Sequence, residues 1–292
     1  MGLLQAFEIW NPFRFAPDIT GRSAISAFIG NPNDLAAFLV PPMLAAIAVS
    51  FAKPESRVFL ISVVVLLFSA LLASGSLTGI AAFGSGALAM LFLRTRRELI
   101  IGVCTIAALF ALLVIIHPPL RERFIGIRTF VVKGEYDRAI SNRMVAFSAA
   151  GLMSLDHPIL GVGPGCFSWN YMEYRRQAEE RFPALQRSDD RLLMFSEVHN
   201  DHLEVLAETG WPGYLLFLGG LVSLSSNSLR RQPPGESAER GVCRLLALPL
   251  ALSLFVLALA GFPLQLAAPT VVYLYEAGLC CAWSTELSGT VQ

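Results

Sequence analysis

The chain has 292 residues, of which 54% are hydrophobic and 15% are charged, and its mean hydropathy is +0.58. An average soluble protein has about 25% charged residues, so this composition indicates a membrane protein and excludes a disordered chain. The 22 Lys and Arg residues balance the 22 Asp and Glu residues, which argues against nucleic acid as a partner. The Cys and His residues have no spacing typical of a zinc site, so no metal is expected.

Seven apolar stretches approach the length of about 20 residues that a helix needs to cross the hydrocarbon core of a bilayer. In chain order they are Leu35–Ala52, Val58–Ala73, Leu77–Leu93, Leu99–Ile116, Pro212–Leu229, Leu245–Phe262 and Leu264–Trp283. The sequence therefore predicts an all-α fold, a polytopic transmembrane helical bundle of about six or seven spans.

The predicted loops alternate in charge. Lys53 and Arg57 lie between the first two spans, whereas the next turn, Ser74–Ser76, is uncharged. Later loops on the same side as Lys53 carry further basic residues: Arg94, Arg96 and Arg97, then Arg230, Arg231, Arg240 and Arg244. Because basic loops stay in the cytoplasm, this side is predicted to be cytoplasmic.

This topology divides the chain into four parts. Residues 1–33 are expected to form an external interfacial segment, and residues 34–116 the first four spans. Residues 117–198 form a long external loop, whose aromatic residues favour a small, mostly helical cap over disorder. Residues 199–292 contain a motif helix, two to three further spans and a C-terminal tail.

The densest group of polar residues lies where the external loop returns to the membrane. It starts at His199, and the spacing of the apolar residues after it predicts a short helix that ends at Gly210. Glu204 and Glu208 share one face of that helix, which is compatible either with a solvated interfacial helix or with a functional site. In the second interpretation His199 is a candidate general base, because imidazole titrates near neutral pH, and His202 is the alternative.

The spacing of His199-Asn200, Gly210 and Gly213 resembles the signature of the membrane family of O-antigen ligases and O-antigen polymerases. Three further stretches resemble the same family: the run Pro158–Phe167 with Gly161, Gly163 and Gly165, the pair Asn142-Arg143, and Gly21-Arg22 followed by Asn31-Pro32-Asn33. The resemblance extends from about Gly21 to Trp283, which is nearly the whole chain.

The resemblance implies glycan transfer from an undecaprenyl-pyrophosphate carrier to an acceptor hydroxyl, on a lipid A-core or similar acceptor, at the periplasmic face of a bacterial inner membrane. It implies no metal, nucleotide or other cofactor. His199 would be the catalytic base, and Arg143 a catalytic residue that binds the pyrophosphate together with Arg22, since guanidinium groups bind phosphate bidentately. Arg128 is a further candidate for the pyrophosphate, with contact to lipid headgroups as the alternative. The remaining motif positions are expected to be structural: Asn200, Glu208, Gly210, Gly213, Gly161, Gly163 and Gly165.

Several other functions stay open at this point. The same donor chemistry would serve a polymerase that extends a glycan on the carrier, or transfer to a protein hydroxyl. A solute transporter is disfavoured, because none of the first six predicted spans has an ionisable residue well inside it. The chain begins near the middle of the family's pattern, so a shortened, non-catalytic membrane scaffold is a further alternative.

Overall fold

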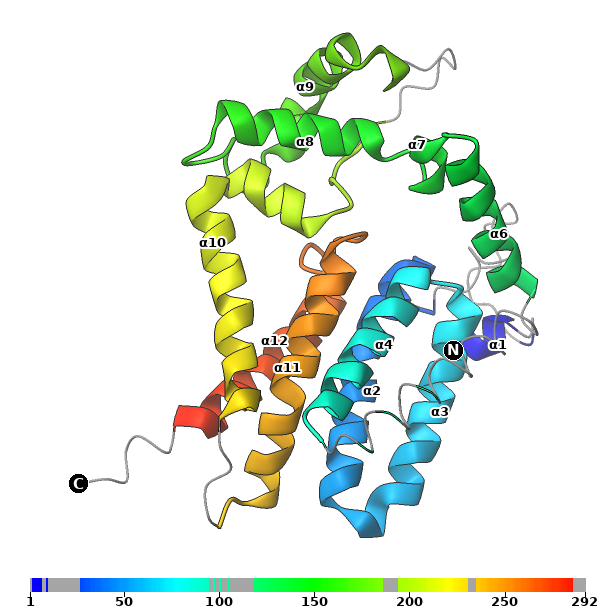
Figure 1. The fold of residues 1–292 in the computed structure, drawn as a ribbon, viewed down its shortest axis with the longest axis vertical. Helices are drawn as coiled ribbons and strands as arrows, with labels where there is room; N and C mark the ends of the chain where they lie inside the picture. Colours follow the sequence, from blue (N-terminus) through cyan, green and yellow to red (C-terminus); the bar gives the residue numbers. More distant parts are fainter. Residues whose placement is uncertain are drawn as a thin grey trace. The chain divides into compact units, whose positions relative to one another are not determined.

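The computed structural model describes residues 2–6, 9, 27–94, 97, 100, 104, 118–185, 194–230 and 235–285. Every regular element within these residues is a helix, which confirms the predicted all-α fold class (Figure 1). Among the predicted features, Arg22 and nearly all of the span Leu99–Ile116 lie outside the described residues.

The chain divides into two compact units. Unit 1 comprises Met1–Leu112, Leu221–Leu257 and Pro263–Gln292, and unit 2 comprises Leu113–Gly220 and Ala258–Phe262. Unit 2 is therefore wider than the predicted external loop at 117–198, because the His199 motif and the short stretch Ala258–Phe262 also belong to it.

Unit 1 is built from apolar helices. They are α1 (Gly2–Ala6), α2 (Pro32–Ala52), α3 (Arg57–Ser74, after the 3-10 turn η2 at Pro54–Ser56), α4 (Leu77–Phe92), α11 (Ala238–Ala258), α12 (Ala267–Thr285) and the C-terminal part of α10 (Asp201–Leu229). Four described segments are long and apolar enough to cross a membrane: Pro32–Ala52, Pro54–Ser74, Asp201–Leu229 and Ala238–Ala258. Shorter apolar helices occupy Leu77–Phe92 and Ala267–Ala282. The chain is thus a multi-pass membrane protein with a helical bundle.

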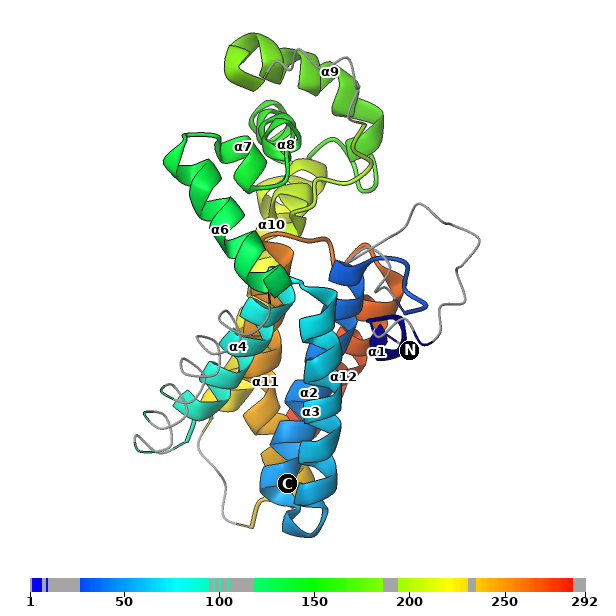
Figure 2. The same cartoon turned by 90° about the vertical axis from the view of Figure 1, so that its right-hand side faces the viewer.

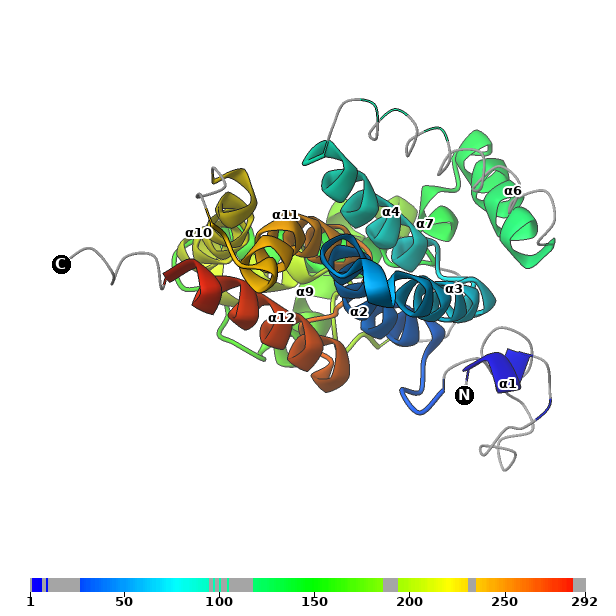
Figure 3. The same ribbon diagram turned by 90° about the horizontal axis from the view of Figure 1, so that it is seen from below.

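The central helix of unit 1 is α2, which packs against α3, α4 and α12 and, in the view along the bundle, lies between α3 and α11 (Figure 3). Its contact with α4 is close because two glycines of α4 face it. A Cβ atom on Gly79 would lie 2.6 Å from the Cβ of Ala36, and one on Gly86 would lie 2.6 Å from Cδ1 of Leu44. Small residues therefore allow the two helices to approach each other closely, as is common in membranes.

The first residues of α2 cap the helix. The side chain of Asn31 accepts a hydrogen bond from the backbone N–H of Asn33 at 2.8 Å, and Pro32 occupies the first turn, where a proline costs no hydrogen bond. The hydroxyl of Ser76 donates to the Asn33 side chain at 3.0 Å and also caps α4 by accepting from Gly79 N. The Asn31-Pro32-Asn33 segment therefore joins the starts of α2 and α4.

Unit 2 is helical throughout its described residues. Its helices are α6 (Pro118–Val132), α7 (Tyr136–Ala139), α8 (Met144–Asp156), α9 (Phe167–Arg181), η3 (Pro183–Leu185) and the N-terminal part of α10. Figure 2 shows α6 leading through α7 to α8, and α8 packs against α9. Their shared core joins apolar residues of α8, three of them alanines, to aromatic residues of α9 and to residues beside and within the His199 motif: Ala146, Ala149, Ala150, Met153, Phe167, Tyr171, Tyr174, Val198 and Ala207. Through this core the His199 motif packs against α8 and α9.

Candidate active site

The predicted helix after His199 is present, with a break at Gly210. The backbone of Gly210 has φ 69° and ψ −173°, which interrupts the helical geometry of α10. Helix α10 begins at Asp201, two residues later than predicted, because His199 itself has a left-handed φ of 61°. Asn200 caps this start, since its side-chain oxygen accepts from Leu203 N at 3.1 Å.

The glycine run packs backbone to backbone against the break in α10. Gly163 N donates to the carbonyl oxygen of Glu208 at 3.0 Å, and Trp211 N donates to that of Pro158 at 2.8 Å. A Cβ atom on Gly161 would lie 2.2 Å from the carbonyl carbon of Glu208, and one on Gly210 would lie 2.6 Å from backbone atoms of the glycine run. Only glycine fits at these two positions, and the two predicted motifs form one substructure.

The carboxylate of Glu208 holds the end of the glycine run. It accepts hydrogen bonds from Gly165 N at 2.8 Å and from Phe167 N, at the start of α9, at 3.0 Å, where a negative charge also stabilises the helix N-terminus. Glu204 accepts from Val198 N at 3.0 Å in the same way. The interpretation of this helix face as solvated is wrong, because Glu204 is only 3% and Glu208 only 7% exposed.

Gly213 allows a second tight contact within α10. A Cβ atom there would lie 2.1 Å from the hydroxyl oxygen of Thr209, and that hydroxyl donates to the carbonyl oxygen of Val205 at 2.6 Å. A side chain at position 213 would therefore collide with Thr209, so this contact requires glycine.

A turn at Leu259–Phe262 connects the predicted site residues. Asn200 donates to the carbonyl oxygen of Leu259 at 2.9 Å, and Arg143 donates to that of Ala260 at 3.1 Å. The ring of His199 lies 4.7 Å from the ring of Phe262, measured between centroids. The apolar run Leu245–Phe262 predicts a single span, so the turn is not predicted from the sequence; α11 ends at Ala258 instead. The glycine and proline on either side of Phe262 were the available signal for a turn.

His199 occupies an apolar environment. Besides Phe262, the ring of Phe195 lies edge-on at 5.8 Å, and the imidazole is half-buried. Its Nδ1 atom is buried and has no hydrogen-bond partner among the described residues. Burial, and secondly the positive charge of Arg143, lower the pKa of His199 from 6.5 to about 4. The imidazole is therefore neutral near pH 7 and able to accept a proton.

The backbone is strained at His199 and in the two residues that precede Arg143. His199 has φ 61°, and the two residues before Arg143, Ser141 and Asn142, have φ 62° and φ 60°. Asp137 holds the second strained segment, because its carbonyl oxygen accepts from Asn142 N at 2.6 Å and its side chain accepts from Met144 N at 3.0 Å. Left-handed backbone in residues other than glycine costs free energy and is concentrated at functional sites.

The family model for O-antigen ligase matches residues 62–218 of the chain, more than half of its length. The chain belongs to the O-antigen ligase family. No curated protein matches it. Membership implies a membrane glycosyltransferase-like enzyme that acts on lipid-linked glycans, and the matched region contains Arg143, the glycine run and the His199 motif. The turn at Leu259–Phe262 lies outside the matched residues of this O-antigen ligase family member.

The structure brings together some of the predicted site residues of this family member and not others. His199 and Arg143 meet at the Leu259–Phe262 turn. The Nδ1 atom of His202 lies 3.3 Å from the hydroxyl oxygen of Tyr214, and His202 is buried, so it belongs to an aromatic contact with Tyr214 that is separate from the Leu259–Phe262 turn. Arg128 is exposed on α6, which packs mainly against α7. No group of three or more metal-binding side chains exists in the part of the chain that the structure describes.

Proposed function

We propose that this protein transfers a glycan from an undecaprenyl-pyrophosphate carrier to an acceptor hydroxyl at the periplasmic face of a bacterial inner membrane. The observation that carries the proposal is the meeting of a neutral, half-buried imidazole and a guanidinium at one turn. His199 and Arg143 both contact Leu259–Phe262, and the charge of Arg143 acts on His199. A base and a cation side by side are what displacement of a pyrophosphate by a hydroxyl requires.

In the proposed reaction His199 takes the proton of the acceptor hydroxyl. The hydroxyl oxygen forms a bond to the anomeric carbon, and the bond from that carbon to the pyrophosphate oxygen breaks with inversion of configuration. The electron pair of the broken bond stays on the pyrophosphate, whose charge Arg143 stabilises, and Arg22 is proposed as a second cation for the same group. A positioned cation of this kind contributes about 3–4 kcal/mol to transition-state stabilisation.

Substrate binding would strengthen the base. In the free protein the charge of Arg143 lowers the pKa of His199. A pyrophosphate bound to Arg143 brings negative charge that offsets this effect, so the pKa of His199 rises toward neutrality when the donor is in place. His199 would thus accept a proton more readily in the donor complex than in the free protein.

The purified full chain, reconstituted in liposomes with a lipid-linked oligosaccharide and candidate acceptors, tests the function. The proposal predicts transfer that consumes the donor and releases undecaprenyl pyrophosphate. A single added glycan on a lipid acceptor identifies a ligase, a ladder of lengths on the carrier identifies a polymerase, and label in a protein acceptor identifies O-glycosylation. Absence of transfer by a folded chain would contradict the proposal and favour a scaffold.

A further inference from the structure

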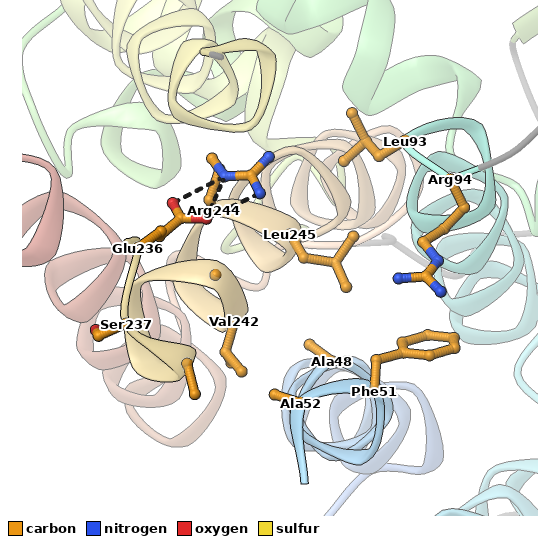
Figure 4. A pocket seen from close by; sticks show the side chains of 12 residues that line it. Ala48, Phe51, Ala52, Leu93, Arg94, Glu236, Ser237, Val242, Arg244 and Leu245 are labelled. Atoms are coloured by element: carbon orange, nitrogen blue, oxygen red, sulfur yellow. Dashed lines mark hydrogen bonds and ion pairs between the residues drawn. The ribbon is translucent and has the colours of Figure 1, made fainter. Parts of the chain in front are cut away.

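Two cavities of unit 1 share Arg94 and Phe51 in their walls. The first, of about 440 Å³, lies between the ends of α2 and α4 and the start of α11 (Figure 4). The second, of about 380 Å³, lies between the end of α2, the start of α3 and Arg94. Arg57, Arg94 and Arg244, one residue from each predicted basic loop, line these cavities.

The first cavity already contains a compensated charge. Arg244 binds the carboxylate of Glu236 through Nε at 3.0 Å and Nη2 at 3.0 Å, as the dashed lines in Figure 4 mark. On the opposite wall the guanidinium of Arg94 lies over the ring of Phe51, with Cζ 4.7 Å from the ring centroid. This stacking fixes the guanidinium at the boundary of the two cavities.

The second cavity combines positive charge with an apolar wall. Arg57 and Arg94 line it, and none of its described lining residues is acidic. The Nε atom of Arg57 donates to the carbonyl oxygen of Ser50 at 3.2 Å, which holds that guanidinium at the cavity. The remaining wall is mostly aliphatic and includes Ile61 and Val64 of α3, and Ile61 is 50% exposed, so the wall opens to the outside of unit 1.

We infer that the second cavity binds the phosphate of an anionic phospholipid from the leaflet on the side of the basic loops. Two guanidiniums match a phosphate group in charge and geometry. The cavity lies where apolar helices of a membrane protein end, which is the depth of the headgroups. The exposed aliphatic residues of α3 supply a surface for an acyl chain. This site is separate from the proposed transfer reaction and does not depend on it.

Native mass spectrometry of the full chain in detergent tests the site, with phosphatidylglycerol and phosphatidylcholine of identical acyl chains as probes. Phosphatidylglycerol is expected to bind more tightly. Arg57→Gln and Arg94→Gln are each expected to weaken its binding about fivefold, the effect of about 1 kcal/mol per basic residue. Arg97→Gln is the matched control, because Arg97 is exposed in the same predicted loop as Arg94 and lines neither cavity.

Three results would overturn the inference. Equal binding of the two lipids would show that charge does not select the ligand, and equal weakening by Arg97→Gln would show a diffuse basic surface. Displacement of phosphatidylglycerol by millimolar inorganic phosphate would assign the site to a soluble phosphate. The melting temperature of each variant is measured in parallel, and Arg94→Lys, which keeps the charge, separates loss of charge from loss of folding.

Discussion

The low pKa of His199 predicts an unusual dependence of glycan transfer on pH. Because the pKa falls from 6.5 to about 4, about 90% of the imidazole is neutral at pH 5. With an unshifted pKa near 6.5, only about 3% would be neutral at that pH. The rate at low donor concentration, which reports kcat/KM and so the free protein, should therefore keep about nine-tenths of its plateau at pH 5.

The donor complex should behave differently. At saturating donor the rate reports kcat, and the bound pyrophosphate offsets the charge of Arg143, so the acidic limb of kcat should lie at higher pH than that of kcat/KM. In Arg143→Gln the smaller cause of the shift is removed while burial remains, so the limb of kcat/KM should move up and stay below 6.5. The plateau rate of this variant should fall by about 10²–10³.

Transfer of a labelled lipid-linked glycan between pH 4 and pH 8 measures both limbs. The folded chain binds a proton at His199 less readily than the unfolded chain, so stability falls as the pH decreases from 6.5 toward about 4. Samples are therefore held at each pH and returned to pH 7 to exclude inactivation. An acidic limb of kcat/KM near pH 6.5 in the unaltered protein, or one that Arg143→Gln leaves in place, would refute the reasoning.

Three further predictions concern the support of the site. Gly161→Ala should lower the free energy of unfolding by at least about 2 kcal/mol, because its Cβ would lie 2.2 Å from a backbone carbon. Gly165→Ala is the matched control: its φ is 73° but there is open space around it, so the free energy of unfolding should fall by about half as much. Denaturation of each variant in detergent measures both values. Glu208→Gln replaces one carboxylate oxygen by an NH2 group, which cannot accept a hydrogen bond, so one of the two backbone N–H groups of Gly165 and Phe167 loses its acceptor. The protein should be destabilised by about 1.5–3 kcal/mol by the same measurement; an unchanged midpoint contradicts that role. Phe262→Leu should move the acidic limb of kcat/KM toward 6.5, because it reduces the burial of His199; a limb that stays in place shows that the ring does not shield the imidazole.

Local patterns predicted most of the helices. The apolar runs Leu35–Ala52, Val58–Ala73 and Leu77–Leu93 correspond to α2, α3 and α4 within a few residues, because a run of that length has few alternatives in a membrane. The break at Gly210 was also predictable, since glycine is the residue that most easily leaves helical geometry.

Contacts between distant segments could not be predicted in the same way. The positions of Glu204 and Glu208 in the sequence are compatible with a solvent-exposed helix face. Both side chains are buried instead, because their carboxylates accept hydrogen bonds from backbone N–H groups of Val198 and of the glycine run. The Leu259–Phe262 turn lies at the end of the apolar run Leu245–Phe262, whose hydropathy is typical of one continuous span. Its importance depends on hydrogen bonds to residues far away in the sequence, which no local pattern encodes.

Substitution of the two histidines of the motif tests the central claim most directly. His199→Gln and His202→Gln each replace an imidazole by a neutral amide, three residues apart on the same segment. Transfer by the reconstituted chain should fall by about 10²–10⁴ in His199→Gln, the contribution expected of a general base, and far less in His202→Gln. Full transfer by His199→Gln, or a loss confined to His202→Gln, would contradict the assignment of His199 as the base.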